Sequence, residues 1–162
     1  MATIYISVGS NIEPDVHVRS ARAALEASFG PAEASPVYRT EAVGFDGDDF
    51  LNLVLALHTD EAVETVDAEL DRIERDNGRD HAAPRFAPRT LDLDLLLYDE
   101  LVMDEDGLRL PRKEIMKYAF VLKPLADLAP DMRHPVDGRC YAELLRELDL
   151  GSQRCEAIAF DW

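Results

Sequence analysis

Hydrophobic and polar positions repeat along the chain with two different periods, one typical of strands and one typical of helices. Residues 3–9 and 50–59 alternate between apolar and polar side chains with a period of two, which predicts strands. Residues 14–29 and 61–77 carry apolar side chains three and four positions apart, which predicts helices. These four segments are the clearest elements of the chain.

Residues with turn and capping preferences set the expected ends of these segments. We expect the first strand to end in a turn at Gly9, and the first helix to stop at Gly30. Asp60 is placed to cap the start of the second helix, and Gly78 is placed to end it.

The remaining elements follow shorter patterns. We expect a strand leading into a loop at 34–45, a leucine-rich strand at 89–99, a hairpin with an Asp-Gly turn at 101–111, a helix interrupted around Pro124 at 113–130, a short helix at 141–150 and a final strand at 155–160. The order strand, helix, strand, strand, helix, strand is the split βαβ arrangement. It predicts an α+β fold, a ferredoxin-like sandwich with a largely antiparallel sheet and helices packed on its faces. With 162 residues, we expect one domain over residues 1–162.

The chain is strongly acidic, with 33 Asp and Glu against 17 Lys and Arg and a formal net charge of −16. This charge argues against nucleic acid or an anionic membrane as a partner, because such surfaces are bound by clustered Lys and Arg. The acidic stretch 61–76 is interpreted as a solvated helix face. No apolar run of about 18 residues and no signal-peptide pattern occurs, so the expected location is the cytoplasm.

An anionic ligand would need a local basic patch, and the chain offers two groups of basic residues. The first group is Arg79, Arg85 and Arg89, and the second is Arg109, Arg112 and Lys113. The first group lies in a loop punctuated by Pro84 and Pro88. Because arginine suits the oxygens of phosphate groups, either group could contact a phosphate chain.

Two aspartates, Asp92 and Asp94, interrupt the leucine-rich strand. Side chains two positions apart in a strand point to the same side, so these carboxylates should share one face while the neighbouring leucines share the other. A half-exposed strand would be the simplest explanation, but strands disfavour Asp. Two close carboxylates can instead bridge a pair of Mg²⁺ ions about 3.5 to 4 Å apart, as in displacement at phosphorus. With the arginines upstream, they predict metal-assisted phosphoryl chemistry.

The common nucleotide-binding motifs, GxxxxGK[ST] and GxGxxG, do not occur in the chain. The segment "PRTLDLDLLLYD" instead resembles the hydroxymethyl-dihydropterin pyrophosphokinase family, whose members transfer pyrophosphate from ATP to a pterin alcohol in the folate pathway. The resemblance extends, in family order, to "YISVGSN", "VYRTEAVG", "FLNLVLAL", "RIERDNGR" and "FVLKPLADLAP". It covers nearly the whole chain and implies the ferredoxin-like fold that the element order suggests independently.

The resemblance also implies roles for individual residues. Asp92 and Asp94 would ligate two Mg²⁺ ions, with Arg79 and Arg89 completing the catalytic set. ATP would be bound by Glu74, Arg79, Arg85, Arg89, Leu95, Arg109, Arg112 and Lys113. The pterin would lie between Phe50 and Phe120, with Asn52 reading its polar edge and Thr40 and Val43 completing the pocket. The loops 44–49 and 78–88 would close over the substrates.

The chain departs from the family pattern in places. Phe86 stands where many relatives have Trp, Tyr118 replaces an Arg near the second stacking residue, and His81 replaces another Arg. Arg112 and Lys113 would supply the lost charge. Because of these departures, a different pterin alcohol as acceptor remains an alternative activity. A non-catalytic nucleotide- or pterin-binding paralogue is the second alternative. The resemblance is also compatible with other folate-pathway enzymes as protein partners.

Overall fold

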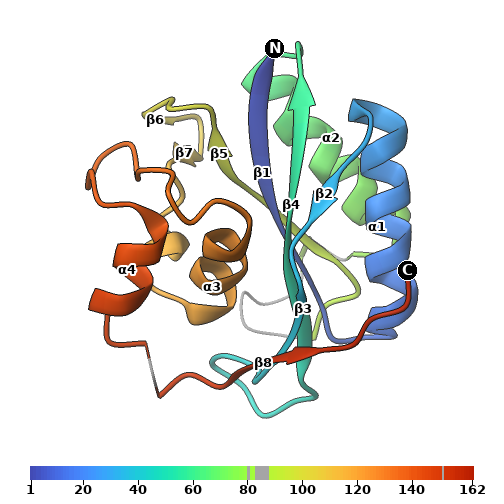
Figure 1. Cartoon of the computed structure of the whole chain (residues 1–162). Helices are drawn as coiled ribbons and strands as arrows, with labels where there is room; N and C mark the ends of the chain where they lie inside the picture. The colour runs from blue at the N-terminus through green and yellow to red at the C-terminus, as the bar shows by residue number, and fades with distance from the viewer. Residues whose placement is uncertain (80, 83–87, 151) are drawn as a thin grey trace.

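The computed structural model describes residues 1–79, 81–82, 88–150 and 152–162, and shows a main sheet with helices on both faces (Figure 1). The elements are β1 (Ala2–Ser10), α1 (Pro14–Phe29), β2 (Glu33–Ala34), β3 (Val37–Thr40), β4 (Phe50–Thr59), α2 (Val63–Asp76), β5 (Asp92–Tyr98), β6 (Met103–Glu105), β7 (Leu108–Leu110), the 3₁₀ helix η1 (Lys113–Met116), α3 (Ala119–Leu128), α4 (Tyr141–Glu147) and β8 (Cys155–Ile158).

The main sheet has the strand order β5-β1-β4-β3-β8, with β2 also pairing with β4. Its strand pairs are antiparallel, and β6 and β7 form a separate hairpin. The hairpin turns at Asp106 and Gly107, which both have positive φ (52° and 77°), as an Asp-Gly turn requires. The α+β fold with an antiparallel sheet is thus confirmed.

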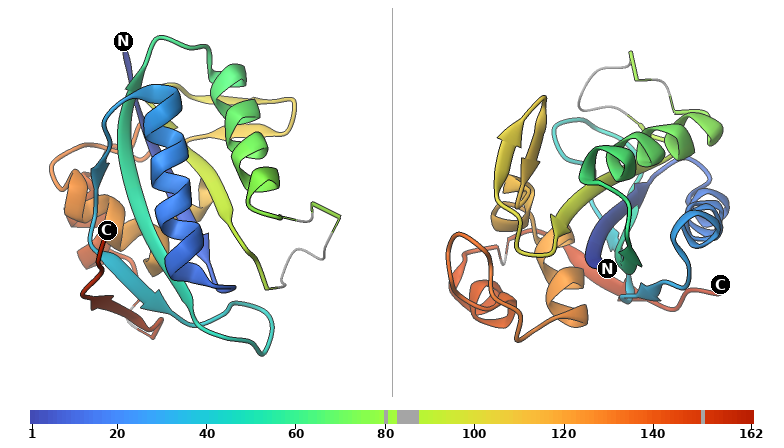
Figure 2. Two further views of the ribbon diagram at one scale, coloured as in Figure 1. Left: turned by 90° about the vertical axis from the view of Figure 1, so that its right-hand side faces the viewer. Right: turned by 90° about the horizontal axis from the view of Figure 1, so that it is seen from above.

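Each face of the sheet has its own hydrophobic core. Helices α1 and α2 cover one face, where Ile4, Ile6 and Leu95 are buried, while α3, α4 and η1 cover the other, where Leu96 and Leu122 are buried. Figure 2 shows both layers from the side and from above. Because the two cores share one sheet, the strands β1, β4 and β5 pack side chains on both of its faces.

A β-bulge interrupts the pairing of β5 with β1. Ile6 faces Leu95 and Tyr5 faces Leu97, so Leu96 is the extra residue. Before the bulge, β5 alternates as expected. Leu93 and Leu95 join the α1–α2 core together with Leu91, which directly precedes the strand, and its two aspartates lie on the other face. The bulge lets Leu96 and Leu97 both join the α3–α4 core.

The strand register aligns small and polar residues across three neighbouring strands. Asp92 of β5 faces Gly9 of β1, and Gly9 faces Asn52 of β4. In the next row on the same face, Asp94 lies opposite Ser7. The aspartates therefore sit beside a strip of sheet that carries no large side chain.

The helix at 14–29 and the strand at 50–59 have the predicted bounds, whereas two predicted boundaries are wrong. The first strand runs through Gly9 to Ser10 without turning there, because Gly9 pairs with both neighbouring strands. The second helix begins at Val63 with Ala62 in the N-cap position. Asp60 instead lies near the N-terminal amine, 3.5 Å away.

The predicted interruption at Pro124 is also wrong, because the break comes earlier. η1 ends at Met116, and Tyr118 is extended (φ −124°, ψ 129°) before α3 starts. Pro124 lies inside α3, where it lacks the N–H that would bond to the carbonyl of Phe120. Packing of the apolar face of α3 compensates for this loss, since Leu122 and its neighbours are buried. Within the described ranges, no helix is long and apolar enough to cross a membrane.

Candidate functional site

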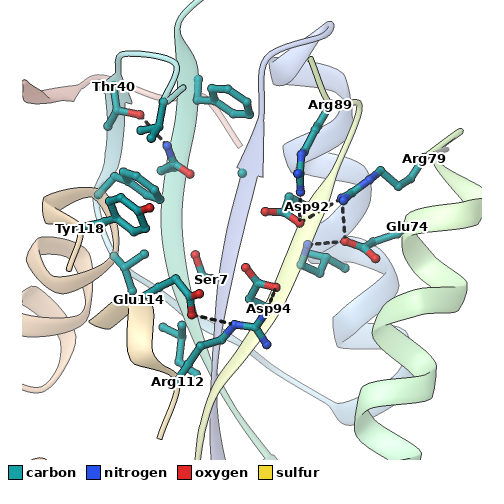
Figure 3. A pocket seen from close by; sticks show the side chains of 18 of the residues that line it. Ser7, Thr40, Glu74, Arg79, Arg89, Asp92, Asp94, Arg112, Glu114 and Tyr118 are labelled. Atoms are coloured by element: carbon teal, nitrogen blue, oxygen red, sulfur yellow. Dashed lines mark hydrogen bonds and ion pairs between the residues drawn. The ribbon is translucent and has the colours of Figure 1, made fainter. Parts of the chain in front are cut away.

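A cavity of about 430 Å³ opens over β1, β4 and β5, on the face of the sheet that α3 covers further along (Figure 3). It is lined from one side by α2 and the start of β5, and from the other by β3, the loop after it and the start of α3. Most of the predicted site residues line this cavity, namely Thr40, Val43, Phe50, Asn52, Glu74, Arg79, Arg89, Asp92, Asp94, Arg112 and Phe120. The structure thus brings together residues from most of the chain.

The floor of the cavity contains a close approach at Gly9. A Cβ atom on Gly9 would lie 2.7 Å from Oδ1 of Asn52. This distance is so short that one of the two residues would have to move. Asn52 is only 5% exposed, and its Nδ2 donates to Oγ1 of Thr40 at 2.6 Å. The absence of a side chain at Gly9 therefore leaves the space that the amide oxygen of Asn52 occupies.

Asp92 is paired with two arginines. Its Oδ1 lies 3.0 Å from Nη1 of Arg79 and 3.2 Å from Nη1 of Arg89. Arg79 reaches β5 from the end of α2, where its Nη1 also donates to the carbonyl of Leu91 at 2.9 Å. These two ion pairs bring Arg79 and Arg89, which are ten positions apart in the sequence, to the same carboxylate (Figure 3).

Glu74 is buried, with 4% of its surface exposed, and both its oxygens have partners. Oε2 accepts from the backbone N–H of Leu93 at 2.8 Å and lies 3.1 Å from Arg79, while Oε1 lies 2.8 Å from Nε2 of His81. Burial raises the pKa of Glu74, and the hydrogen bonds from His81 and Leu93 lower it in part. Asp71 approaches the same group, with ligand atoms of Asp71, Glu74 and His81 all within 4.8 Å of one another.

Asp94 is paired with a different arginine. Its Oδ1 lies 3.1 Å from Nη2 of Arg112, whose Nε is 3.2 Å from Oε2 of Glu114. Burial, followed by the negative charge of Asp92, raises the pKa of the Asp94 carboxyl to about 7, and Arg112 acts in the opposite direction. Among the described residues, Asp94 therefore has one arginine beside it, where Asp92 has two.

The described lining of the cavity carries more acids than bases. The carboxylates are Glu41, Asp67, Asp71, Glu74, Asp92, Asp94 and Glu114, and the arginines are Arg79, Arg89 and Arg112. Seven acids against three bases leave four negative charges when all are ionised. Carboxylate oxygens suit hard divalent cations such as Mg²⁺, so Asp92 and Asp94 fit a metal pair, and two such ions would balance this charge.

Two pairs of aromatic rings line the opposite end of the cavity. Phe50 meets Phe45 edge to face with ring centroids 6.3 Å apart, and Phe120 stacks on Tyr118 at 4.9 Å with an interplanar angle of 17°. Lys117 lies 5.4 Å from the Tyr118 ring centroid. Offset stacking suits a flat heterocycle, so this end offers aromatic faces next to the amide of Asn52.

Asn11 links the two loops that flank the cavity. Its Oδ1 accepts from the backbone N–H of Arg89 at 2.7 Å, its backbone N–H donates to the Arg89 carbonyl at 3.0 Å, and its Nδ2 donates to the Asp48 carbonyl at 3.1 Å. The side chain is buried. Asn11 thus fixes the start of the Arg89–Asp92 segment relative to the loop 44–49.

Three predicted ATP contacts lie away from the cavity. Arg109 and Lys113 are exposed and do not line it, and Leu95 is buried in the α1–α2 core. Of the second basic group, only Arg112 lines the cavity. Arg85 and the substituted Phe86 lie outside the described residues.

Several lining residues were not expected from the sequence. The interpretation of 61–76 as a solvated face is wrong for Asp67 and Asp71, which line the cavity in helical spacing with Glu74, the one acid of this helix that the family resemblance predicts in the site. That spacing was the available signal. Glu114 and Ser7 carried no comparable pattern, whereas Gly9, a glycine inside a strand, could have indicated close approach.

Comparison with known proteins gives a consistent result. The family model for 7,8-dihydro-6-hydroxymethylpterin-pyrophosphokinase (HPPK) matches residues 5–130. A Pseudomonas aeruginosa protein named 2-amino-4-hydroxy-6-hydroxymethyldihydropteridine pyrophosphokinase is 42% identical over 147 residues, covering 88% of this chain and 89% of the relative. An Aquifex aeolicus protein of the same name is 30% identical over 149 residues, covering 91% and 90%.

The structural comparison supports the same fold. The crystal structure of wild-type Plasmodium falciparum HPPK-DHPS with SDX-DHP has a TM-score of 0.71 and 11% sequence identity. The match covers 91% of this chain but only 43% of that longer one.

Proposed function

The chain belongs to the HPPK family, and on this premise we propose that its cavity transfers pyrophosphate from ATP to the hydroxymethyl group of 6-hydroxymethyl-7,8-dihydropterin, giving AMP and the pterin diphosphate. Pyrophosphoryl transfer to hydroxymethyldihydropterin, a step of folate biosynthesis, is the activity that the family and the named relatives share. The proposal adds ATP as donor, two Mg²⁺ ions and the roles of individual residues.

The row Asp92–Gly9–Asn52 is the observation that carries the residue assignments. Neighbouring strands lie about 4.8 Å apart, so Asp92 and Asn52 are separated by about 10 Å across Gly9. A bicyclic pterin with one exocyclic arm has comparable length. With its polar edge at Asn52, its hydroxymethyl arm would extend past Gly9 towards the aspartates.

Asn52 and Thr40 are suited to read the pterin edge. The Asn52 amide has both a donor and an acceptor, and its donor bond to Thr40 leaves Oδ1 as the acceptor over the floor. Phe50 and Phe120 both line the cavity and offer ring faces for stacking, and Val43 lines it with them. Tyr118 also lines the cavity and stacks on the Phe120 ring.

Asp92 and Asp94 would hold the two Mg²⁺ ions. When bound, these ions would neutralise the triphosphate and polarise the β-phosphorus and the attacking oxygen. The pterin oxygen forms the new bond to the β-phosphorus and loses its proton, and the bond from that phosphorus to the α–β bridging oxygen breaks with AMP as leaving group. No covalent enzyme intermediate is required, so the protein contributes positioning and charge.

Arg79, Arg89 and Arg112 would bind the phosphate oxygens, as the arginines that line the cavity among the described residues. Glu74 has a different role in this proposal: it holds Arg79 and the backbone of Leu93 rather than contacting the nucleotide. The proposal treats residues 1–162 as one pyrophosphokinase domain acting in the cytoplasm. Small molecules are its substrates.

The direct test is AMP formation by purified protein supplied with Mg²⁺, ATP and 6-hydroxymethyl-7,8-dihydropterin. We expect AMP and pterin diphosphate in equal amounts, and no AMP when the pterin or the metal is left out. Hydrolysis of ATP to ADP, or binding of both substrates without AMP, would contradict the proposal. Asp94→Asn is expected to lower turnover by at least about a hundredfold while the fold is kept.

A further inference from the structure

Arg112 lies between two carboxylates of the cavity wall, Asp94 and Glu114. Its Nη2 is 3.1 Å from Asp94 Oδ1, and its Nε is 3.2 Å from Glu114 Oε2 (Figure 3). On the Glu114 side, Nε and Oε2 are both buried and do not meet in an aligned hydrogen bond. The guanidinium is therefore held by charge on both sides, but it is not locked to Glu114.

The main chain at Arg112 is fixed although its side chain is not locked. Its backbone N–H donates to the carbonyl of Leu96 at 3.0 Å, which attaches this segment to β5 beside Asp94. Its carbonyl accepts from the N–H of Ile115 at 3.2 Å, at the start of η1. Only the side chain needs to turn for the guanidinium to change partners.

Asp94 has a stronger need for a counter-ion than Asp92. Asp92 pairs with both Arg79 and Arg89, whereas Arg112 is the one cation paired with Asp94 among the described residues that line the cavity. A divalent cation on Asp94 would take an oxygen that Arg112 now faces and would repel the guanidinium at such close range. Glu114 lies in position to receive it.

We propose that Arg112 is an exchangeable counter-ion of the metal site. It neutralises Asp94 while no divalent cation is bound, and it turns to Glu114 and the nucleotide phosphates when a cation binds Asp94. This inference rests on the metal pair of the proposed function. It makes Arg112 a positioning residue in the metal-free protein and a phosphate contact in the loaded one.

The first test measures binding of Mn²⁺ alone to the full chain, by electron paramagnetic resonance, without nucleotide. Arg112→Met removes the competing cation, so Mn²⁺ should bind about three- to tenfold more tightly. The matched control is Arg75→Met, which removes one charge from an exposed site on α2 that does not line the cavity. The control should leave the Mn²⁺ affinity unchanged within about twofold.

The second test measures the affinity for a non-hydrolysable ATP analogue at saturating Mn²⁺. Here Arg112→Met should weaken binding about tenfold, because a phosphate partner is lost. Opposite changes in the two titrations are the signature of exchange. Weaker analogue binding with unchanged Mn²⁺ affinity would overturn the counter-ion role, and tighter Mn²⁺ binding with unchanged analogue affinity would overturn the transfer to phosphate.

Two further variants separate this inference from the proposed function. Asp94→Asn should reduce the Mn²⁺ affinity sharply, and an unchanged affinity would overturn both the metal site and the exchange. Arg112→Lys keeps the charge and should stay close to the unmodified chain in the Mn²⁺ titration. If Arg112→Met does not fold, an Arg112→Lys variant that bound Mn²⁺ as tightly as a charge-free Arg112→Gln variant would overturn the inference.

Discussion

The buried carboxylate of Glu74 accepts a hydrogen bond from the backbone N–H of Leu93 at 2.8 Å, joining α2 to β5. Because β5 is at the edge of the sheet, some of its backbone N–H groups have no neighbouring strand to bond, and Glu74 satisfies one of them. Leu93 lies between the two aspartates. Glu74 thus fixes β5 at the point where both aspartates leave the strand.

We predict that Glu74→Ala destabilises the protein by about 2 to 3 kcal/mol, because Leu93 N–H and Arg79 both lose a buried partner. Glu74→Gln keeps an acceptor for Leu93 and should cost about 1 kcal/mol. Denaturant unfolding of the two variants measures the difference. Equal losses would show that the charge, and not the acceptor, is what matters.

The metal-free protein should become less stable as the pH rises through about 7, relative to Asp94→Asn. The folded pKa of Asp94 is raised to about 7 by burial and by Asp92, above the value of about 3.9 in an unfolded chain. The folded state therefore binds more protons between these values, so the contribution of Asp94 to stability is fully present below pH 4 and is lost as the pH rises through 7.

The measurement is a pair of thermal or denaturant unfolding series with chelator, at pH 5 and pH 8.5. From pH 5 to pH 8.5, the free energy of unfolding of Asp94→Asn should rise by about 1 to 2 kcal/mol relative to that of the unmodified chain. Adding Mg²⁺ at pH 8.5 should stabilise the unmodified chain more than the variant. A pH-independent difference between the two proteins would contradict this assignment.

Gly9→Ala should weaken pterin binding more than nucleotide binding. The new Cβ would lie 2.7 Å from Asn52 Oδ1, so Asn52 must move, and its bond to Thr40 would be strained. We expect about a tenfold loss of pterin affinity and about 1 to 2 kcal/mol of stability. Calorimetric titration with each substrate measures the first, and unfolding measures the second.

A double variant tests whether a steric clash with Asn52 causes the effects of Gly9→Ala. Gly9→Ala combined with Asn52→Ser shortens the clashing side chain, so it should recover stability without recovering pterin affinity. Recovery of neither would point to a different cause for the effect of Gly9→Ala.

Asn11→Ala should loosen the start of the Arg89–Asp92 segment. The variant loses the acceptor for Arg89 N–H and the donor to the Asp48 carbonyl, both at a buried site. We expect about 1 to 3 kcal/mol of destabilisation and at least about tenfold faster amide exchange at Arg89. Hydrogen-exchange mass spectrometry or NMR can check this. Unchanged exchange at Arg89 would show that other contacts suffice to order the segment.

Sequence patterns predicted the elements well where local signals were strong. The helix before Gly30 and the alternating strand at 50–59 have their predicted bounds because a helix stop and a period of two are local features. Pro124 misled the prediction, since proline is a local signal whereas the packing of α3 that tolerates it is tertiary.

The site was predictable in part for the same reason. Asp92 and Asp94 share a face by strand geometry, and the structure places both in the cavity. The second basic group was not predictable in the same way. The course of the chain from β7 into η1 decides which of its side chains reaches the cavity. The sequence therefore does not distinguish Arg112 from Arg109 or Lys113. The sequence did not identify Asp67 and Asp71 of α2 as lining residues, because a pocket wall and a solvated helix face have the same composition.

The bulge at Leu96 has a consequence for how sequences of this kind can change in length. A chain without Leu96 would still pair Leu95 with Ile6 and Leu97 with Tyr5, so the aspartates would keep their orientation. A deletion between Asp92 and Leu95 would instead turn at least one aspartate into the α1–α2 core. Insertions and deletions in natural variants of β5 should therefore be confined to the bulge, which separates a segment of fixed length from one that evolution can adjust.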